Sequence, residues 1–446
     1  MNSLRHRIAT WRADHILRRV VRNSGYLFSS TTISAGLGFV QGIFAVRLLG
    51  IDGYGLAAGT IMLFASNVNR LLSFRMSEVV VKFLGEALAE GRPDRAAAVV
   101  KGIGLVEGFT SVVAYLVLLA LTPWAAHTLA KDPATASLFA FYGLTLLSNL
   151  IYETSTGVLQ ATDRFDRVAV INLIQSIITA LMIFADFLLK RGLLDVLTAY
   201  LVGKTFAGLA VIYFAVRELN KVLGRHWVHA SLRQLTDWRS IGSFAINTNL
   251  NGTVTLFVRD NAPLYLAAFR SQAEVGYFKL ALSLVNMVSL PIEPFIWPTY
   301  AELTRSIALK KWRETRQLLR RVSAIAGGWT LAAGGGLLAL GWWLLPLVYG
   351  ADALPAYYSL SILLIGYGVA NIFHWNRPLL LAFGKPGFPL MAMAVVGALE
   401  IGLIFLLVPR FGYLVESAIV SGFFVLAIGW IVWRGLSVLH QQEISA

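Results

Sequence analysis

The sequence predicts an all-α polytopic membrane protein with about 12 transmembrane helices in two pseudo-symmetric six-helix lobes. Three observations lead to this prediction. Hydrophobic residues make up 57% of the 446 residues, charged residues only 14%, and the mean hydropathy is +0.67, whereas a soluble domain has about 25% charged residues. The apolar residues form long runs separated by short polar connections, and a Gly-Tyr motif of the first half recurs in the second half.

The predicted spans follow from the thickness of the bilayer. A hydrocarbon core of about 30 Å needs roughly 20 apolar residues in a helix. The apolar runs that meet this length lie at residues 24–49, 55–84, 96–121, 137–159, 166–189, 194–216, 240–268, 276–300, 318–348, 355–382, 386–408 and 411–434. The first six form the predicted N-terminal lobe (24–216) and the last six the predicted C-terminal lobe (240–434).

Three polar segments flank these lobes. Residues 1–23 contain six arginines between apolar residues but no apolar core and no small-residue cleavage site. They therefore predict a basic amphipathic segment on the cytoplasmic membrane surface rather than a cleaved signal peptide. Residues 217–239 are the predicted cytoplasmic linker between the lobes, and residues 435–446 are the predicted cytoplasmic tail.

The loop charges predict the orientation. Basic residues gather in alternate connections, most densely in 217–239 and 305–321, while the other connections carry few charges. Cytoplasmic loops are the ones enriched in Lys and Arg, so both termini are expected in the cytoplasm of a bacterial or archaeal cell, with the protein in the plasma membrane. This rule explains the net charge of +14 without a nucleic-acid partner. The absence of cysteine excludes disulfides and thiolate metal sites.

The connection after the first span indicates an internal duplication. It reads Arg47-Leu-Leu-Gly-Ile-Asp-Gly-Tyr-Gly55, and a weaker copy occurs at Arg270–Tyr277. The Gly53-Tyr54 and Gly276-Tyr277 pairs lie 223 residues apart, half of the chain. Parallel repeats of six spans usually bind substrate between them, and Gly50, Gly53 and Gly276 supply the backbone freedom of a hinge. The alternative is a chance coincidence of evenly spaced helices.

Several short motifs resemble those of one transporter family. Arg47-x-Leu49-Gly50-x-x-x-Tyr54-Gly55, Leu159-Gln-Ala-Thr-Asp-Arg164 and Arg259-Asp260 followed by Gly276-Tyr277 are similar to the polysaccharide exporters. These belong, with the Wzx-type lipid-linked oligosaccharide flippases, to the multidrug/oligosaccharidyl-lipid/polysaccharide superfamily. Phe278, which follows Gly276-Tyr277, departs from the family pattern. This position varies within the family, so the departure does not weaken the resemblance.

The resemblance implies a fold, a cargo and partners. It implies two six-helix lobes forming a V-shaped central cleft lined by the first, second, seventh and eighth spans. It also implies transport of a polyprenyl-diphosphate-linked glycan from the cytoplasmic to the outer leaflet. Polysaccharide polymerase and glycosyltransferases would be functional partners in the same membrane. No cofactor is implied, and coupling to an H⁺ or Na⁺ gradient or to the membrane potential is left open.

Cations within the spans are the candidate substrate-binding residues. Guanidinium groups bind phosphate oxygens bidentately and stay charged, so Arg70, near the midplane of the second span, is the leading candidate for the diphosphate. The alternative is an ion pair with Glu293, which the duplication places opposite it. Arg75, nearer the cytoplasm, either adds to this site or is a solvated helix end. Arg47, Arg259 and Lys279 lie near the outer boundary, where they either line the cleft or hold an outer gate.

The remaining charged residues are candidates for coupling or gating. Intramembrane carboxylates are rare and usually functional or paired. Glu153 and Asp186 are candidate proton or sodium sites, with interhelical pairing as the alternative. Asp260 and Glu293 are gate candidates, and Arg377 lies near the cytoplasmic end of its span.

Prolines predict a break in the eighth span. Pro291, Pro294 and Pro298 fall within eight residues, and each removes a backbone donor, so the helix must kink or unwind there. Pro291 and Pro294 are therefore hinge candidates, and a static kink is the alternative.

The sequence favours a transporter over an enzyme. It contains no metal-ligand spacing, nucleophile elbow or phosphate-binding glycine loop, and no loop is long enough for a catalytic domain. Two alternatives share the predicted fold. A drug/cation antiporter would favour carboxylates in its cleft, whereas the candidates here are mainly cations. A flippase for the peptidoglycan lipid precursor has an equally anionic cargo.

Overall fold

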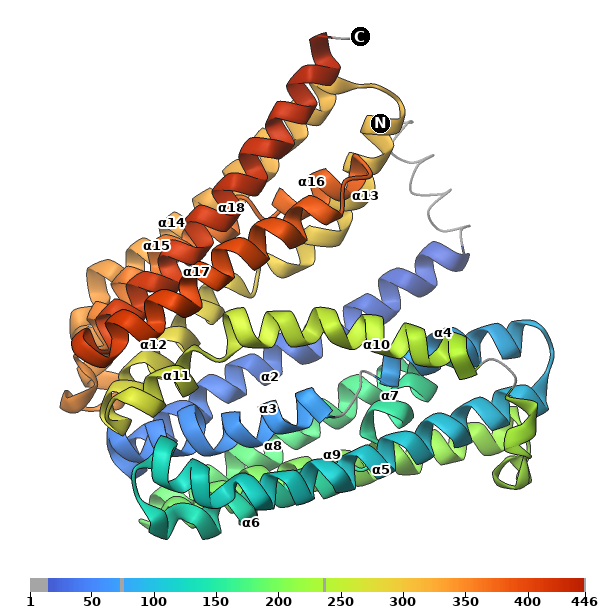
Figure 1. The fold of residues 1–446 in the computed structure, drawn as a ribbon, viewed down its shortest axis with the longest axis horizontal. Helices are drawn as coiled ribbons and strands as arrows, with labels where there is room; N and C mark the ends of the chain where they lie inside the picture. Colours follow the sequence, from blue (N-terminus) through green and yellow to red (C-terminus); the bar gives the residue numbers. More distant parts are fainter. Residues whose placement is uncertain (1–14, 73–75, 236–237, 445–446) are drawn as a thin grey trace. The chain divides into compact units, whose positions relative to one another are not determined.

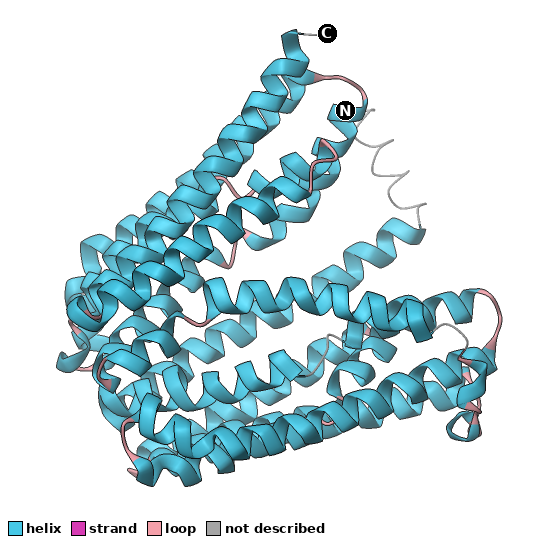
Figure 2. Ribbon diagram, in the orientation of Figure 1, coloured by secondary structure: helices cyan, strands magenta, loops and turns pink. Residues whose placement is uncertain are grey.

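The computed structural model describes residues 15–72, 76–235 and 238–444, and throughout these residues the chain is helical without any strand (Figure 2). The predicted all-α class is therefore confirmed.

Each predicted span of the first half corresponds to a helix or a run of helical segments. These are α2 (His15–Tyr54), η1 (Gly55–Ile61) with α3 (Met62–Leu72) and α4 (Met76–Ala89), α5 (Pro93–Ala125) with η2 (Ala126–Ala130), α6 (Ala136–Ser148) with α7 (Tyr152–Ala161), α8 (Phe165–Leu188) and α9 (Leu193–Val222) (Figure 1). Short 3₁₀ turns follow in the connections: η3 (Pro133–Thr135), η4 (Trp227–His229) and η5 (Leu232–Gln234).

The second half repeats this organisation. It contains α10 (Trp238–Thr255), η6 (Leu256–Asp260) and α11 (Ala262–Phe269), then α12 (Gln272–Ser289), η7 (Glu293–Phe295) and α13 (Ile296–Ala308), α14 (Trp312–Tyr349), η8 (Ala351–Ala353), α15 (Ala356–Ile372) with α16 (Asn376–Ala382), α17 (Gly387–Phe411) and α18 (Tyr413–Ile444).

Most of these segments are long and apolar enough to cross a membrane. Nine such helices occur among the described residues, and the bent pair α12 and α13 makes a tenth. The first of the nine, Ser29–Ala89, is 61 residues long, far more than the roughly 20 that one crossing needs, and it contains the first two predicted spans. The predicted span 240–268 is helical but not among them, because Asn247, Asn249 and Asn251 lower its hydropathy.

The helix bounds follow the 223-residue offset of the predicted duplication. Displacing α8 by 223 residues gives 388–411, and α17 occupies Gly387–Phe411. Both halves also break the same span: α6 gives way to α7 between Ser148 and Tyr152, and α15 gives way to α16 between Ile372 and Asn376. Because the breaks coincide as well as the spans, even spacing alone does not account for the repeat.

The chain forms two compact units. One comprises Met1–Gly42, Ala65–Pro123 and Ala136–Thr253, and the other comprises Ile43–Phe64, Trp124–Thr135 and Val254–Ala446. In the first unit, Val79 and Leu84 of α4, Val158 of α7 and Val211 of α9 are fully buried in one cluster. The second unit includes the end of α2, all of η1 and η2, and the second half of the chain. The predicted lobe boundaries, with the linker at 217–239, stay a prediction.

The outward surface of many helices is apolar. Leu181 of α8, Leu331 of α14 and Phe405 and Leu406 of α17 are each more than half exposed. Large apolar side chains in such a position are stable in contact with lipid, whereas in water they would mark an interaction surface. This pattern is expected of helices that face a bilayer.

Candidate functional site

The two copies of the duplicated motif lie against each other. Gly50 has φ 71°, which interrupts α2 as the sequence predicted. Five residues later, at Gly55, η1 begins and packs on the start of α12. A Cβ on Gly55 would lie 2.0 Å from the carbonyl oxygen of Gln272, and one on Gly276 would lie 2.3 Å from that of Ile51. The two backbones therefore meet at positions where only glycine fits.

Gly53 and Gly59 have different surroundings. A Cβ on Gly53 would meet only Leu49 of its own helix, at 2.8 Å. One turn beyond Gly55, a Cβ on Gly59 would lie 2.4 Å from Val275 Cγ1 and 3.8 Å from its Cβ. Gly55 and Gly59 thus form the small-xxx-small face that lets two membrane helices approach closely. The sequence analysis identified the Gly55 turn but not this face.

The side-chain amide of Gln272 ties three segments together. Thr60 Oγ1 donates to Gln272 Oε1 at 2.8 Å, and Gln272 Nε2 donates to the Leu129 carbonyl of η2 at 2.6 Å. Thr60 is fully buried, so its hydroxyl depends on this bond. Gln272 was not among the candidate residues predicted from the sequence. The one sequence feature that could have pointed to it is its position in the second motif copy.

Arg47 joins α2 to the last turn of α14. Its Nε donates to the Val348 carbonyl at 2.7 Å and its Nη2 to the Leu347 carbonyl at 2.5 Å. These carbonyls lie at the C-terminal end of α14, where a cation also stabilises the helix dipole. Arg47 is therefore paired with the end of a helix, and its role in an outer gate stays a prediction. Substrate binding by Arg47 stays a prediction.

A second polar group surrounds the start of α12. Glu274 accepts from Arg270 Nε at 2.8 Å and from the Tyr413 N–H at 2.9 Å, which connects α12 to α18. Lys131 Nζ donates to the Arg270 carbonyl at 2.7 Å. Partial burial, followed by the charge of Arg270, lowers the pKa of Lys131. Together, residues 47–60, 129–131, 270–276 and 347–348 form a contact that we call the outer seal, after the side of the membrane on which the loop charges predict it to lie.

The other candidate cations lie in different places. Lys279 is half-buried one turn after Val275, and its Cβ would be 3.8 Å from a Cβ on Gly59, so it borders the outer seal. Arg70 is half-buried in the last turn of α3, within the first unit. Arg75 lies outside the described residues. Arg259 lies in η6, and its side chain is likewise outside the described part of the chain. Their roles in substrate binding stay predictions.

The predicted break in the eighth span is confirmed. α12 ends at Ser289 and α13 begins at Ile296, and the helical segments on either side are bent by 43°. Pro291 and Pro294 lie in this break, as does Glu293, which is exposed in η7. Arg70 and Glu293 belong to different units, so their pairing stays a prediction, as does motion at this break.

Glu153 belongs to a chain of hydrogen bonds at the break between α6 and α7. It accepts from Ser77 Oγ of α4 at 2.5 Å. Glu107 of α5, only 1% exposed, accepts from the N–H groups of Glu153 at 2.9 Å and Thr154 at 2.7 Å. These are unsatisfied donors of the first turn of α7, so Glu107 caps a helix that begins inside the protein. Glu107 is not among the candidate residues that the sequence indicated.

The remaining gate candidates belong to three different helical segments. Asp186 is half-buried two residues before the end of α8, and its Oδ2 has no hydrogen-bond partner within the described chain. Asp260 is half-buried at the end of η6, and Arg377 is exposed in the first turn of α16. Asp186 belongs to the first unit, and Asp260 and Arg377 belong to the second, so their joint role as a gate stays a prediction.

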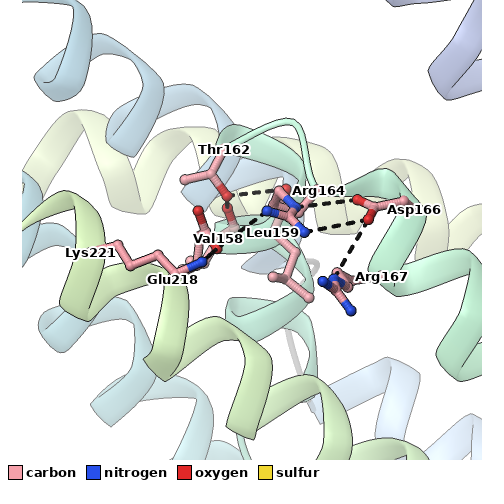
Figure 3. Close-up of polar contacts among 8 residues, drawn as sticks. All are labelled: Val158, Leu159, Thr162, Arg164, Asp166, Arg167, Glu218 and Lys221. Carbon is pink, nitrogen blue, oxygen red and sulfur yellow. Dashed lines mark hydrogen bonds and ion pairs between the residues drawn. The ribbon is translucent and has the colours of Figure 1, made fainter.

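The motif at the end of the fourth span anchors the turn to α8 (Figure 3). Thr162 Oγ1 donates to the Val158 carbonyl at 2.9 Å. Arg164 pairs with Asp166 at 3.3 Å and with Glu218 of α9 at 3.8 Å, and Figure 3 shows Arg167 and Lys221 completing the cluster. The ion pairs of Arg164 thus connect the start of α8 to α9, directly after the end of α7.

Comparison with known proteins identifies the class of this fold. A multidrug-resistance MATE transporter of the MOP superfamily, solved in an inward-facing conformation, superposes with a TM-score of 0.72 at 15% identity over 93% of this chain and 96% of its own. The lipid II flippase MurJ superposes with a TM-score of 0.68, also at 15% identity, over 94% of this chain and 91% of its own. At such identities these likenesses establish the fold, which is that of transporters.

A sequence relative and a family model narrow the class. The Escherichia coli (strain K12) inner membrane protein YghQ is 26% identical over 356 residues, which are 78% of this chain and 98% of that protein. Together with the apolar helices, this shows a multi-pass integral membrane protein. The model of the family described as "Polysaccharide biosynthesis protein" matches residues 20–302. The chain belongs to this polysaccharide biosynthesis protein family and has the fold of the MOP-superfamily transporters.

Proposed function

We propose that this protein is a flippase that moves a polyprenyl-diphosphate-linked oligosaccharide from the cytoplasmic to the outer leaflet by alternating access. Family membership supports a role in the synthesis of cell-surface polysaccharide, and the fold supports transport. The single observation that carries the mechanism is the outer seal, in which the two copies of a duplicated motif meet backbone to backbone at Gly55 and Gly276.

The outer seal has the construction of a reversible gate. Its central contact is close packing of glycine backbones, which leaves no side chains to disentangle when the helices part. Its polar bonds depend on few residues: Arg47, Thr60, Gln272 and Lys131 supply the donors. Each neutral hydrogen bond contributes only about 0.5–1.5 kcal/mol net, because water replaces the partner when the helices separate. The closed state is therefore stable without being locked.

The cargo is inferred from charge. A diphosphate headgroup needs permanent cations along its route, and Arg70, Arg75, Arg259 and Lys279 are the candidates within the spans that we propose for this role. Lys279 borders the seal, where it would meet the headgroup as the outer side opens. The prenyl chain would remain in the lipid. The proposal includes coupling of glycan transport to H⁺, to Na⁺ or to the membrane potential. Transport assays must decide among these three.

Reconstitution tests the cargo. The protein in liposomes should expose a fluorescent polyprenyl-diphosphate glycan, loaded in the inner leaflet, to a membrane-impermeant quencher. Protein-free liposomes supply the background, and lipid-linked peptidoglycan precursor and a cationic dye serve as competing cargoes. Movement of the dye without the glycan would overturn the proposal, and movement of the peptidoglycan precursor alone would assign a different anionic lipid.

A disulfide tests the gate, and the chain contains no natural cysteine to interfere. Gly59→Cys with Val275→Cys should cross-link, because their Cβ atoms would be 3.8 Å apart, close to the mean for disulfides. Oxidation should abolish glycan movement in the double variant, and reductant should restore it. Each single variant is the matched control. Full transport by cross-linked protein would show that the outer seal does not open during the cycle.

A further inference from the structure

The tyrosine of the duplicated Gly-Tyr motif has different surroundings in its two copies. Tyr54 is only 7% exposed, so its ring belongs to the packed interior of the second unit. Tyr277, in the second turn of α12, is partly exposed, and its hydroxyl makes no hydrogen bond within the described part of the chain. Packing therefore accounts for the first tyrosine but leaves the hydroxyl of the second available to a ligand.

Two more tyrosines lie close to Tyr277 in the same compact unit. The ring centroids of Tyr277 and Tyr413 are 5.4 Å apart. The Tyr413 hydroxyl donates to the Pro355 carbonyl at 3.3 Å, which places the start of α15 beside these rings. Tyr358, in the first turn of α15, is 54% exposed and interacts electrostatically with Tyr413. We call these three partly or largely exposed tyrosines the tyrosine cluster.

Two carboxylates without partners flank the tyrosine cluster. Asp52 and Tyr277 directly follow Ile51 and Gly276, the residues at which the backbones of α2 and α12 meet. Asp352 lies in η8, just before α15. Both aspartates interact electrostatically with the Tyr277 hydroxyl. Both are exposed, and neither forms an ion pair or a hydrogen bond with any described residue, so both remain as acceptors.

A third carboxylate near the Tyr277 hydroxyl has a different role. Glu274 also interacts electrostatically with this hydroxyl. It accepts from Arg270 Nε at 2.8 Å and from the Tyr413 N–H at 2.9 Å. Glu274 therefore holds Tyr413 against α12, and the acceptors left for a ligand are the two aspartates.

Two simpler explanations do not cover this arrangement. Among the described residues, no group of three or more acids and imidazoles could hold a metal ion. Tyrosines are common where helices leave the bilayer, but this preference explains exposed rings and not unpaired carboxylates around a tyrosine hydroxyl. A ligand that uses both features has an apolar face for the rings and hydroxyl donors for the carboxylates. A sugar ring has both.

We propose that the tyrosine cluster, together with Asp52 and Asp352, binds a sugar of the transported glycan on the outer side of the membrane. The C–H face of the sugar lies on the aromatic rings, and its hydroxyls donate to the carboxylates in charge-assisted hydrogen bonds. The two aspartates belong to connections that the loop charges predict to face outward. The inference rests on the proposed function, and it gives the glycan a contact separate from the cations expected to meet the diphosphate.

The liposome assay described above tests this site. Tyr358→Ala/Asp352→Ala removes one exposed ring and one free carboxylate. Tyr213→Ala/Asp94→Ala is the matched control, because it removes an exposed tyrosine and an exposed aspartate of the first unit. The cluster variant should move the fluorescent polyprenyl-diphosphate glycan about tenfold more slowly than the unmodified protein, and the control should match the unmodified protein. Thermal unfolding of both variants verifies that each is folded.

A binding measurement separates this inference from the proposed function. Saturation-transfer NMR of the full-length protein in detergent uses the free oligosaccharide of the same lipid as the probe, and tetraphenylphosphonium as a cationic comparison. Binding of the oligosaccharide that is lost in the cluster variant and kept in the control supports the site, whether or not the lipid moves. Equal oligosaccharide signals in the two variants, or loss of tetraphenylphosphonium binding alone, would overturn it. Unchanged glycan transport by the cluster variant would also overturn the site, while leaving the flippase function intact.

Discussion

At the scale of single residues, two side chains that carry no family signature connect distant segments of the chain. Gln272 bridges Thr60 and Leu129 through its one amide, and Glu107 caps the N-terminus of α7 from a neighbouring helix. Neither role follows from sequence, because each depends on which backbone groups of distant segments lie within about 3 Å. Arg47 illustrates the reverse: the sequence predicted its level in the membrane, and only the fold showed that its partners are carbonyls of α14.

Removal of the Glu107 cap should destabilise the protein. Glu107→Ala leaves two buried N–H groups of α7 without an acceptor, which costs about 1–3 kcal/mol for each unsatisfied donor. Glu107→Gln keeps one acceptor oxygen and should lose less. Thermal unfolding in detergent measures both, with Glu86→Gln on the exposed side of α4 as control. Equal unfolding temperatures for Glu107→Ala and the control would show that the cap contributes no stability.

At the scale of elements, the breaks in the helices matter more than the helices. The prolines after α12 and the paired interruptions in α6/α7 and α15/α16 fall inside predicted spans, and Gly50 falls in a predicted connection but interrupts the helix α2. The Gly50 and proline breaks were predictable, because these residues alter the backbone directly. The paired interruptions were not, because tertiary partners such as Glu107 satisfy the exposed backbone groups and so permit the break.

The close contact of η1 with α12 should be sensitive to one methyl group. In Gly276→Ala the new Cβ would lie 2.3 Å from the Ile51 carbonyl oxygen, and overpacking of this kind costs about 1–3 kcal/mol. Thr60→Cys places a reporter at a fully buried position of the seal. This cysteine should react with maleimide about tenfold faster when Gly276→Ala is also present than when it is absent.

Gly402→Ala, where a Cβ would have no neighbour within 4 Å, is the matched control for this experiment. It carries the same cysteine at position 60 and should leave its reactivity unchanged. If both alanine variants react at the same rate, the glycine contact does not hold the seal closed.

At the scale of the whole molecule, orientation is a property of loop charge. The basic connections predict that the segment after α9 faces the cytoplasm and that the α14–α15 connection faces outward. His229→Cys and Asp352→Cys place single exposed cysteines at these two places in a cysteine-free chain. In right-side-out vesicles, a membrane-impermeant maleimide should label position 352 and not 229, and inverted vesicles should give the opposite result. The reverse pattern would invert the predicted topology.

The sequence by itself determined the helical class, the membrane location, the positions of the spans and the repeat of 223 residues. Each follows from local composition, since hydropathy, helix period and glycine or proline chemistry act within a few residues. Only the tertiary structure decided that the two motif copies meet, that Gln272 and Glu107 hold the contacts, and that Tyr277 lies beside Tyr413. These depend on distances between segments far apart in the chain, which no local pattern records.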